Sequence, residues 1–308
     1  MTGHPVGVID IGSNTTNLLI VDSDGNDIDR AITTTRLGDR VFSTGVLQED
    51  AINRTLQTVV DYVSRCRENN VSDIRIVGTA ACRTASNTDQ LAQRIKETTR
   101  CELHVLKASD EARLSFEGAL VGLVPHDELT VVVDIGGGST EFTVGVHEPD
   151  QVASIDHGAV AITQRDFTAD PPLPEELTNA IGAVTDDIEE LTRSMPALLS
   201  SPRFVGTAGT FVTVAAVELG LMEFDRDALH SMVLTRESAE DVFRTLATEK
   251  FEERILNPGL PYDRADIIVA GCCIVVAIMR RLHLSEIVIS TGGLLDGVAR
   301  HIPWKMAQ

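Results

Sequence analysis

Basic residues are scarce in this chain of 308 residues, where 26 lysines and arginines stand against 46 aspartates and glutamates, a formal charge of −20. Proteins that bind nucleic acid without sequence preference depend on broad basic surfaces, so the composition argues against that class. It does not argue against an anionic substrate, because a local cleft can be basic on an acidic protein.

Cysteine pairs at redox or metal spacing are also absent. The five cysteines are odd in number and form no Cys-x-x-Cys motif; they are Cys66, Cys82, Cys101, Cys272 and Cys273. We therefore expect reduced, mostly buried thiols and a cytoplasmic protein. The 8 histidines show no metal-ligand spacing either, and we interpret them as surface or core residues.

No long hydrophobic run is present. The N-terminus lacks the basic segment and apolar stretch of a signal peptide, and it reaches a predicted strand within a few residues. The longest apolar run, residues 267–279, contains a glycine and is too short to cross a bilayer, which needs roughly 20 residues. We expect no membrane partner. The run predicts a buried core helix, and the interface of a homodimer is the alternative.

Two segments share one pattern, residues 8–16 and 132–140. Each is an apolar β run that ends in Asp-Ile-Gly, followed by small and hydroxyl residues and a second β run. Glycine lets the backbone approach an anion, while amides and hydroxyls cradle phosphate oxygens. The aspartate at the strand end can hold a hydrated divalent cation. Two tight hairpin turns are the alternative, but the run of three glycines exceeds what one turn requires. The repetition suggests paired halves that face each other across a cleft.

The rest of the chain alternates between strands and helices, which predicts an α/β protein with largely parallel sheets. We expect strands at 74–79, 103–106, 153–156, 203–205 and 287–289, and helices around 52–63, 89–98, 109–120, from 174 onward, at 267–279 and after 293. The polar segment 124–128 predicts a hinge between domains 1–124 and 125–308. Two glycine-rich loops, 206–210 and 290–293, each lead from a strand into a helix, where anions are favoured.

The hairpins and these two loops resemble the actin/Hsp70/sugar-kinase superfamily. Further stretches resemble the exopolyphosphatase/guanosine pentaphosphate phosphatase (Ppx/GppA) family, over about residues 6–300; they are residues 78–87, 110–114, 134–141, 158–163, 170–172 and 264–271. The resemblance implies two ribonuclease-H-like (actin-like ATPase) domains that flank an interdomain cleft. It also implies that the extra C-terminal helical domain of longer members is absent.

By this resemblance, Glu111 activates the water that attacks the terminal phosphorus. A carboxylate serves as a general base when it lies within hydrogen-bond reach of that water. Taken alone, Asp110 and Glu111 look like the acidic first turn of an ordinary helix. Arg83 and Asn87 are implied to point into the cleft, and the alternative for Arg83 is an ion pair at a helix start.

Asp10, Asp134 and Glu141 are the candidate ligands for Mg²⁺ or Mn²⁺, because Mg²⁺ prefers a few carboxylates together with water and phosphate oxygens. A turn residue is the alternative for either aspartate, and solvent exposure is the alternative for Glu141.

The candidate phosphate-binding residues come from the two hairpins, the segment after residue 78 and the loop 206–210. They are Ser13, Asn14, Thr15, Arg83, Asn87, Gly136, Gly137, Gly138, Ser139, Thr140, Gly206, Thr207, Gly209 and Thr210. In the superfamily's ATPases the last of these loops holds adenosine. We expect the second hairpin to bind phosphate more tightly, because it keeps the full glycine run, whereas Asn17 in the first replaces the family's usual arginine.

These residues predict an exopolyphosphatase, a phosphoric anhydride hydrolase that releases terminal orthophosphate from linear polyphosphate with Mg²⁺, with a preference for short chains. The first alternative is a guanosine pentaphosphate (pppGpp) 5′-phosphohydrolase, against which the neutral Asn17 argues. A superfamily kinase or ATPase is the second, and a polyphosphate- or alarmone-binding regulator without turnover is the third.

Overall fold

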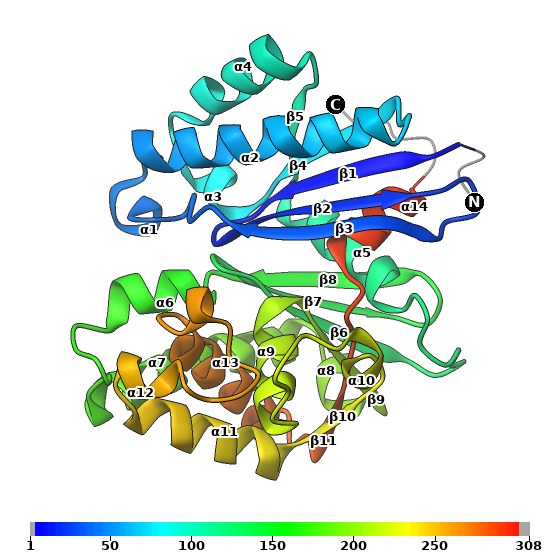
Figure 1. Cartoon of the computed structure of the whole chain (residues 1–308). Coiled ribbons are helices and arrows are strands. Elements are labelled where there is room, and N and C mark those ends of the chain that lie inside the picture. Colours follow the sequence, from blue (N-terminus) through cyan, green and yellow to red (C-terminus); the bar gives the residue numbers. More distant parts are fainter. Residues whose placement is uncertain (1–3, 302–308) are drawn as a thin grey trace. The chain divides into compact units, whose positions relative to one another are not determined.

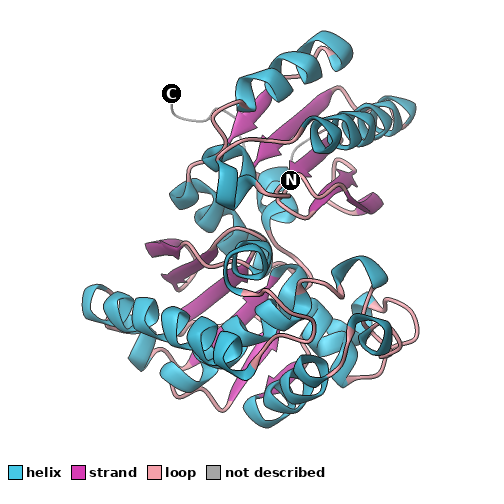
Figure 2. Ribbon diagram, turned by 90° about the vertical axis from the view of Figure 1, so that its left-hand side faces the viewer, coloured by secondary structure: helices cyan, strands magenta, loops and turns pink. Residues whose placement is uncertain are grey.

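The computed structural model describes residues 4–301. The chain divides into two α/β units (Figure 1). The first unit runs to Gly118 and resumes at Leu294, and the second unit comprises Ala119–Gly293. In each of them the strands form a layer with helices packed beside it (Figure 2).

The first unit has a five-stranded sheet in the order β3-β2-β1-β4-β5. β1 pairs antiparallel with β2, which pairs antiparallel with β3, while β4 and β5 run parallel to β1. The strands are β1 (Val6–Ile11), β2 (Thr15–Val21), β3 (Asp27–Thr34), β4 (Asp73–Gly78) and β5 (Leu103–Val105), and the helices are α1 (Val41–Thr44), α2 (Glu49–Glu68), α3 (Ala80–Thr84), α4 (Thr88–Thr99), α5 (Ala108–Ala119) and α14 (Leu294–Arg300).

Both faces of the sheet are buried at β1 and along most of β2, whose sequences are largely apolar, whereas the edge strand β3 has no buried residue. Ile9 and Ile11 of β1 point to the face that α2 and α4 cover. Val6 and Val8 point to the opposite face, where they pack with Leu114 of α5 and with α14. The alternation of side chains along one strand therefore supplies two separate cores.

The second unit has a six-stranded sheet in the order β10-β11-β9-β6-β7-β8. Its strands are β6 (Thr130–Ile135), β7 (Thr140–Gly145), β8 (Pro149–Ile155), β9 (Arg203–Thr207), β10 (Val233–Thr235) and β11 (Glu286–Ile289). Its helices are α6 (Ala159–Asp166), α7 (Pro174–Ser194), α8 (Ala197–Ser200), α9 (Ala208–Glu218), α10 (Arg226–Leu229), α11 (Arg236–Thr248), α12 (Phe251–Arg254) and α13 (Ile268–Arg281), with a 3₁₀ turn at Tyr262–Arg264.

The α/β fold class and the repeated plan are confirmed. β8-β7-β6-β9-β11 of the second unit repeats the order β3-β2-β1-β4-β5 of the first. In both, an antiparallel meander of three strands is extended by two strands parallel to its first member. This is the ribonuclease-H-like arrangement that the resemblance implies.

α13 is the predicted core helix. Every side chain from Ile268 to Met279 is buried among other residues of the second unit. The alternative that this run forms a dimer interface is therefore wrong, because its side chains already lie inside one unit.

The unit boundary differs from the predicted boundary at residue 124. The polar segment 124–128 follows residues that are already anchored in the second unit, where the Ser290 hydroxyl donates to the Ala119 carbonyl over 2.7 Å and Leu123 is buried. The second difference is α14, which belongs to the first unit and not to a domain 125–308.

Two contacts hold α14 on the first unit. Val298 and Ala299 are buried against β1 and β2, and the buried Arg75 of β4 donates to the Val298 carbonyl over 2.6 Å and to the His301 carbonyl over 2.9 Å. A cation at the carboxyl end of a helix also interacts favourably with the helix dipole.

Across the described residues, no helix combines the length and the hydropathy that a bilayer crossing requires.

We predict that Gly297→Ala destabilises the first unit. A Cβ at Gly297 would lie 1.9 Å from the Leu114 carbonyl oxygen, so α14 would have to move off α5. Such overpacking costs about 1–3 kcal/mol of unfolding free energy. The matched control is Gly182→Ala in α7, where nothing lies within 4 Å and better helix propensity is expected to add up to ~1 kcal/mol. Chemical denaturation measures both, and equal stability of the two variants would contradict the packing argument.

Candidate functional site

The first hairpin turns tightly between β1 and β2. The Gly12 amide donates to the Thr15 carbonyl over 2.9 Å, so Ser13 and Asn14 form the tip. Both tip side chains are buried, with 4% and 8% of their surface exposed. Within residues 4–301, Ser13 Oγ and Asn14 Nδ2 make no hydrogen bond. Buried donors without acceptors are costly, so this tip suits an anion.

The second hairpin makes the same turn, since the Gly136 amide donates to the Ser139 carbonyl over 3.0 Å. Its backbone also receives the start of α6. The Gly137 carbonyl accepts from the amides of Val160 and Ala161, and a Cβ at Gly158 would lie 2.4 Å from Gly137. The close approach of α6 to the hairpin therefore requires glycine at position 158.

Each strand-end aspartate faces one residue across its hairpin. Asp10 pairs with Asn17, whose Nδ2 donates to Asp10 Oδ2 over 3.0 Å. Asp134 pairs with Glu141, whose Oε1 accepts from the hydroxyls of Ser139 over 2.6 Å and Ser154 over 3.0 Å.

Two facing carboxylates fit a magnesium ion. Asp134 and Glu141 are 9% and 2% exposed, and no group of three or more His, Cys, Asp or Glu side chains at metal-binding distance occurs among the described residues. Mg²⁺ commonly takes one or two carboxylates and fills its other positions with water and phosphate oxygens. The pair is therefore sufficient on the protein's side.

Glu111 and Arg83 form an ion pair in the first unit. Glu111 lies in the first turn of α5 with 12% of its side chain exposed, and Arg83 ends α3 with 21% exposed. Arg83 Nη1 donates to Glu111 Oε2 and also to the Leu106 carbonyl, the latter over 3.2 Å. The predicted base and a predicted phosphate ligand are thus in direct contact.

The parallel strands bring these side chains to one edge of the sheet. Asp10 is opposite Val77 in the register of β1 and β4, α3 follows β4, and α5 follows β5. The buried Cys82 thiol reports this proximity. Its pKa is raised to about 12, chiefly by burial and also by the charges of Asp10 and Glu111, while Arg83 acts to lower it.

Asn87 makes a contact that its motif did not predict. Its Oδ1 accepts from the Leu47 amide over 2.8 Å, and its Nδ2 donates to the Leu47 carbonyl over 3.1 Å. Both ends of the amide are thereby bonded to the main chain, so Asn87 fixes the segment that leads into α2.

The loop 206–210 contains a strained residue, Ala208, with φ +66° in the left-handed region. Non-glycine residues avoid this region, and strain of this kind gathers at functional loops. Thr207 lies beside Asp134 in the register of β6 and β9, and its hydroxyl donates to the Gly292 carbonyl. Both glycine-rich loops of the second unit are therefore joined next to Asp134.

Arg264 lies against this loop. Its guanidinium would be 2.2 Å from a Cβ at Gly209, so Gly209 is required for the contact. Burial lowers the pKa of Arg264, and the neighbouring Asp263 partly offsets that effect. The guanidinium makes no hydrogen bond or ion pair with the part of the chain that the structure describes. Arg264 is not among the site residues predicted from the sequence. The one signal that could have identified it is its place in the family-like stretch 264–271.

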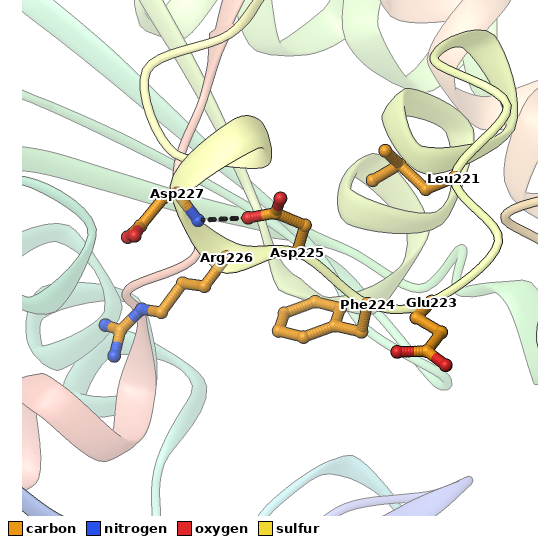
Figure 3. Close-up of a pocket in the computed structure, with 6 residues that line it drawn as sticks. All are labelled: Leu221, Glu223, Phe224, Asp225, Arg226 and Asp227. Carbon is orange, nitrogen blue, oxygen red and sulfur yellow. Dashed lines mark hydrogen bonds between the residues drawn. The ribbon is translucent and has the colours of Figure 1, made fainter.

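A surface pocket of about 370 Å³ was not predicted from the sequence (Figure 3). Phe224, 66% exposed, contributes a ring, and Arg226 Nε donates to Thr291 Oγ1 over 3.2 Å, which joins the pocket to the loop 290–293. Asp225 caps α10 through the Asp227 amide. The lining residues are Leu221, Glu223, Phe224, Asp225, Arg226 and Asp227.

Several known proteins are similar to this chain in sequence and in fold. The chain is 32% identical to "Exopolyphosphatase 2" of Mycobacterium tuberculosis, over 96% of this chain and 97% of that protein. An exopolyphosphatase from Cytophaga hutchinsonii has a structure with a TM-score of 0.88, 26% identity and 96% coverage of both chains. The Aquifex aeolicus member of the Ppx/GppA protein family gives a TM-score of 0.78, with 30% identity and 96% coverage of both chains.

The sequence profile of the Ppx/GppA phosphatase family matches residues 18–302. That span includes the Arg83–Glu111 pair, the second hairpin with its facing carboxylates, and both glycine-rich loops of the second unit. The chain therefore belongs to the Ppx/GppA phosphatase family.

Proposed function

We propose that this protein is an exopolyphosphatase that hydrolyses the terminal phosphoanhydride bond of linear polyphosphate. The observation that carries the proposal is the Glu111 carboxylate, held by Arg83 at the same sheet edge as Asp10 and the first hairpin. The name and the near-complete coverage of Exopolyphosphatase 2 support the same substrate.

In the proposed reaction, water attacks the terminal phosphorus in line with the bond to the leaving phosphate. Glu111 accepts the proton of the water, and the bridging oxygen leaves with the shortened chain. Arg83 fixes the orientation of Glu111, while the hydroxyls and amides of the first hairpin hold phosphoryl oxygens. The products are orthophosphate and a polyphosphate shorter by one unit.

Asp134 and Glu141 would hold the Mg²⁺ ion, for which Mn²⁺ is a plausible replacement in oxygen-rich coordination. When bound, the ion neutralises charge on the phosphoryl group and on the leaving phosphate. Arg264 beside Gly209 would supply a further positive charge to the second unit's loops. We also infer a reducing, cytoplasmic location, because all five cysteines are free thiols.

One observation favours a second candidate, the pppGpp 5′-phosphohydrolase. The exposed Phe224 ring near the loop 290–293 offers a surface on which a purine base could stack. Asn17 argues against this candidate, because a neutral amide replaces the arginine that the family usually provides for anion recognition.

Phosphate release with Mg²⁺ from polyphosphates of defined length, measured beside pppGpp and ATP, tests the proposal. Release from polyphosphate at a kcat/KM at least about tenfold above the other two supports it, and the shortest good substrate tests the expected short-chain preference. Preference for pppGpp would establish the second candidate. ATP turnover or transfer to an acceptor would establish a kinase or ATPase, and tight binding without release would establish a regulator.

We predict that Glu111→Gln lowers kcat for polyphosphate by about 10²–10⁴-fold with little change in substrate binding, because the amide cannot take a proton from water. The matched control is Glu117→Gln on the same helix, which is expected to keep full activity. Steady-state kinetics and equilibrium binding of polyphosphate measure both effects. Unchanged kcat in Glu111→Gln would remove Glu111 as the base.

We predict that Glu141→Gln raises the Mg²⁺ concentration needed for half-maximal activity by about tenfold or more, since one of two anionic ligands is lost. Glu148→Gln, at the exposed turn before β8, is the control and is expected to leave the Mg²⁺ requirement unchanged. Titration with MgCl₂ at saturating substrate measures the effect. An unaltered Mg²⁺ requirement in Glu141→Gln would mean that the ion binds at another site.

A further inference from the structure

The first turn of α6 is bonded to the second hairpin. The Ala159 amide donates to the Gly136 carbonyl over 3.1 Å. The amides of Val160 and Ala161 donate to the Gly137 carbonyl over 2.8 and 2.9 Å. The first amides of a helix have no partner within the helix, and here the hairpin supplies their acceptors. The place where α6 begins therefore determines where these two glycine carbonyls lie.

His157, two residues before α6, is bonded to the same hairpin through its main chain. Its carbonyl accepts from the Thr140 hydroxyl over 2.6 Å, and Thr140 is fully buried at the start of β7. Thr140 directly precedes Glu141, which we propose as a metal ligand. The next residue, Gly158, lies so close to the hairpin that a Cβ on it would be 2.4 Å from Gly137. The position of His157 therefore sets how α6 rests on the hairpin.

The His157 ring is buried and has a partner at each nitrogen. Nε2 lies 3.0 Å from Asp187 Oδ2 of α7, and Nδ1 lies 3.0 Å from Arg165 Nη2 of α6. A guanidinium only donates, so Nδ1 accepts from Arg165. The neutral ring then carries its proton on Nε2 and donates it to Asp187. A protonated ring would instead bring an N–H of His157 against an N–H of Arg165.

Burial and charge keep the ring neutral. The pKa of His157 is lowered from its ordinary 6.5, chiefly by burial and also by the charge of Arg165, while Asp187 and Asp166 act to raise it. Asp187 is half-exposed, so water screens its attraction for a protonated ring. The titratable groups around the ring and its partners are Asp187 of α7, Arg165 and Asp166 of α6, Cys273 of α13 and Asp156. The Arg165 contact is thus present above the pKa of the ring and is lost as the pH falls through it.

We propose that His157 is a positioning residue whose neutral ring holds α6 and α7 together beside the second hairpin, and that protonation of this ring in acid loosens the hairpin. When the ring takes a proton from solvent, Arg165 loses its acceptor and two cations face each other. α6 then loses its tie to residue 157, and its first turn is free to shift on Gly136 and Gly137. The effect on catalysis rests on the proposed function, because the hairpin carries the proposed metal ligands.

Two substitutions test the inference by moving the pKa of His157 in opposite directions. Arg165→Gln removes the neighbouring cation and is expected to raise that pKa, whereas Asp187→Asn removes the neighbouring anion and is expected to lower it. NMR of protein with labelled histidine and glycine measures the titration, and His157→Gln identifies the ring's signal among the 8 histidines. We expect the amide signals of Gly137 and Gly138 to titrate with the ring and to follow both shifts.

The Mg²⁺ concentration needed for half-maximal polyphosphate hydrolysis is the functional measurement. One pH unit below the midpoint of the ring, about one-tenth of the chains keep it neutral, so this concentration is expected to rise by up to about tenfold. Asp134, Glu141 and Glu111 also take up protons in acid. The opposite displacements are therefore decisive, with the rise at higher pH in Arg165→Gln and at lower pH in Asp187→Asn.

The matched controls are two histidine substitutions. His157→Gln keeps a polar side chain that does not titrate, and we expect the glycine signals to lose their titration in it. His147→Gln removes an exposed histidine from the turn before β8 and is expected to leave that titration in place. Glycine signals that titrate unchanged in His157→Gln would overturn the inference.

Should His157→Gln fail to fold, the other two variants decide. Glycine signals with the same midpoint in Arg165→Gln and Asp187→Asn would then overturn the inference. The NMR measurements use no polyphosphate. A chain that hydrolyses no polyphosphate but whose glycine signals follow the ring would therefore refute the proposed function and leave the role of His157 standing.

Discussion

The antiparallel pairing of β1 with β2, and of β6 with β7, is the constraint on which the rest of the structure depends. It fixes which residue faces each strand-end aspartate and which residues form each tip. Because side chains alternate along a strand, a slip of one residue would turn Asp10 and Asn17 into the core and bring apolar side chains to the tip. Both faces of the first unit's sheet are buried at β1, so such a slip is strongly disfavoured.

The same sheets explain why candidate site residues far apart in the sequence lie close together within each unit. Strands parallel to β1 end at the edge where Asp10 lies, and the elements that follow them place Arg83, in the last turn of α3, and Glu111, in the first turn of α5, near that edge. The second unit repeats this logic, since β9 ends with Thr207 beside Asp134. The candidate site residues are therefore concentrated at the carboxyl edges of the parallel strands, where loops and short helices provide polar groups.

The sequence predicted the elements whose patterns are strong. The apolar runs of β1, β6 and α13 and the helical periodicity of α2 and α7 appear where they were expected. β3 was not predicted, because it is an edge strand that has no buried side chain and lacks a period-2 pattern. The return of α14 to the first unit was also missed, since a boundary signal at residues 124–128 says nothing about where the last helix packs.

For the candidate site residues, composition and motif predicted which side chains carry chemistry but not which of them are in contact. The Arg83–Glu111 contact joins α3 and α5, which are separated along the chain by α4 and β5, and no spacing rule connects them. Asn87 was predicted to bind phosphate, but both ends of its side-chain amide form hydrogen bonds with the main chain of Leu47. The role of such a side chain depends on which residues surround it in the folded protein, and local sequence patterns do not show those neighbours.

The return of α14 has a consequence for biosynthesis. Val6 and Val8 emerge from the ribosome long before Val298 and Ala299, which help to cover that face of the sheet. The nascent first unit thus carries an uncovered apolar surface while the whole second unit is translated. Exposed apolar surface of this kind is prone to aggregation and is recognised by chaperones. A truncation that removes α14 would leave that surface permanently exposed, although every residue of both hairpins would still be present.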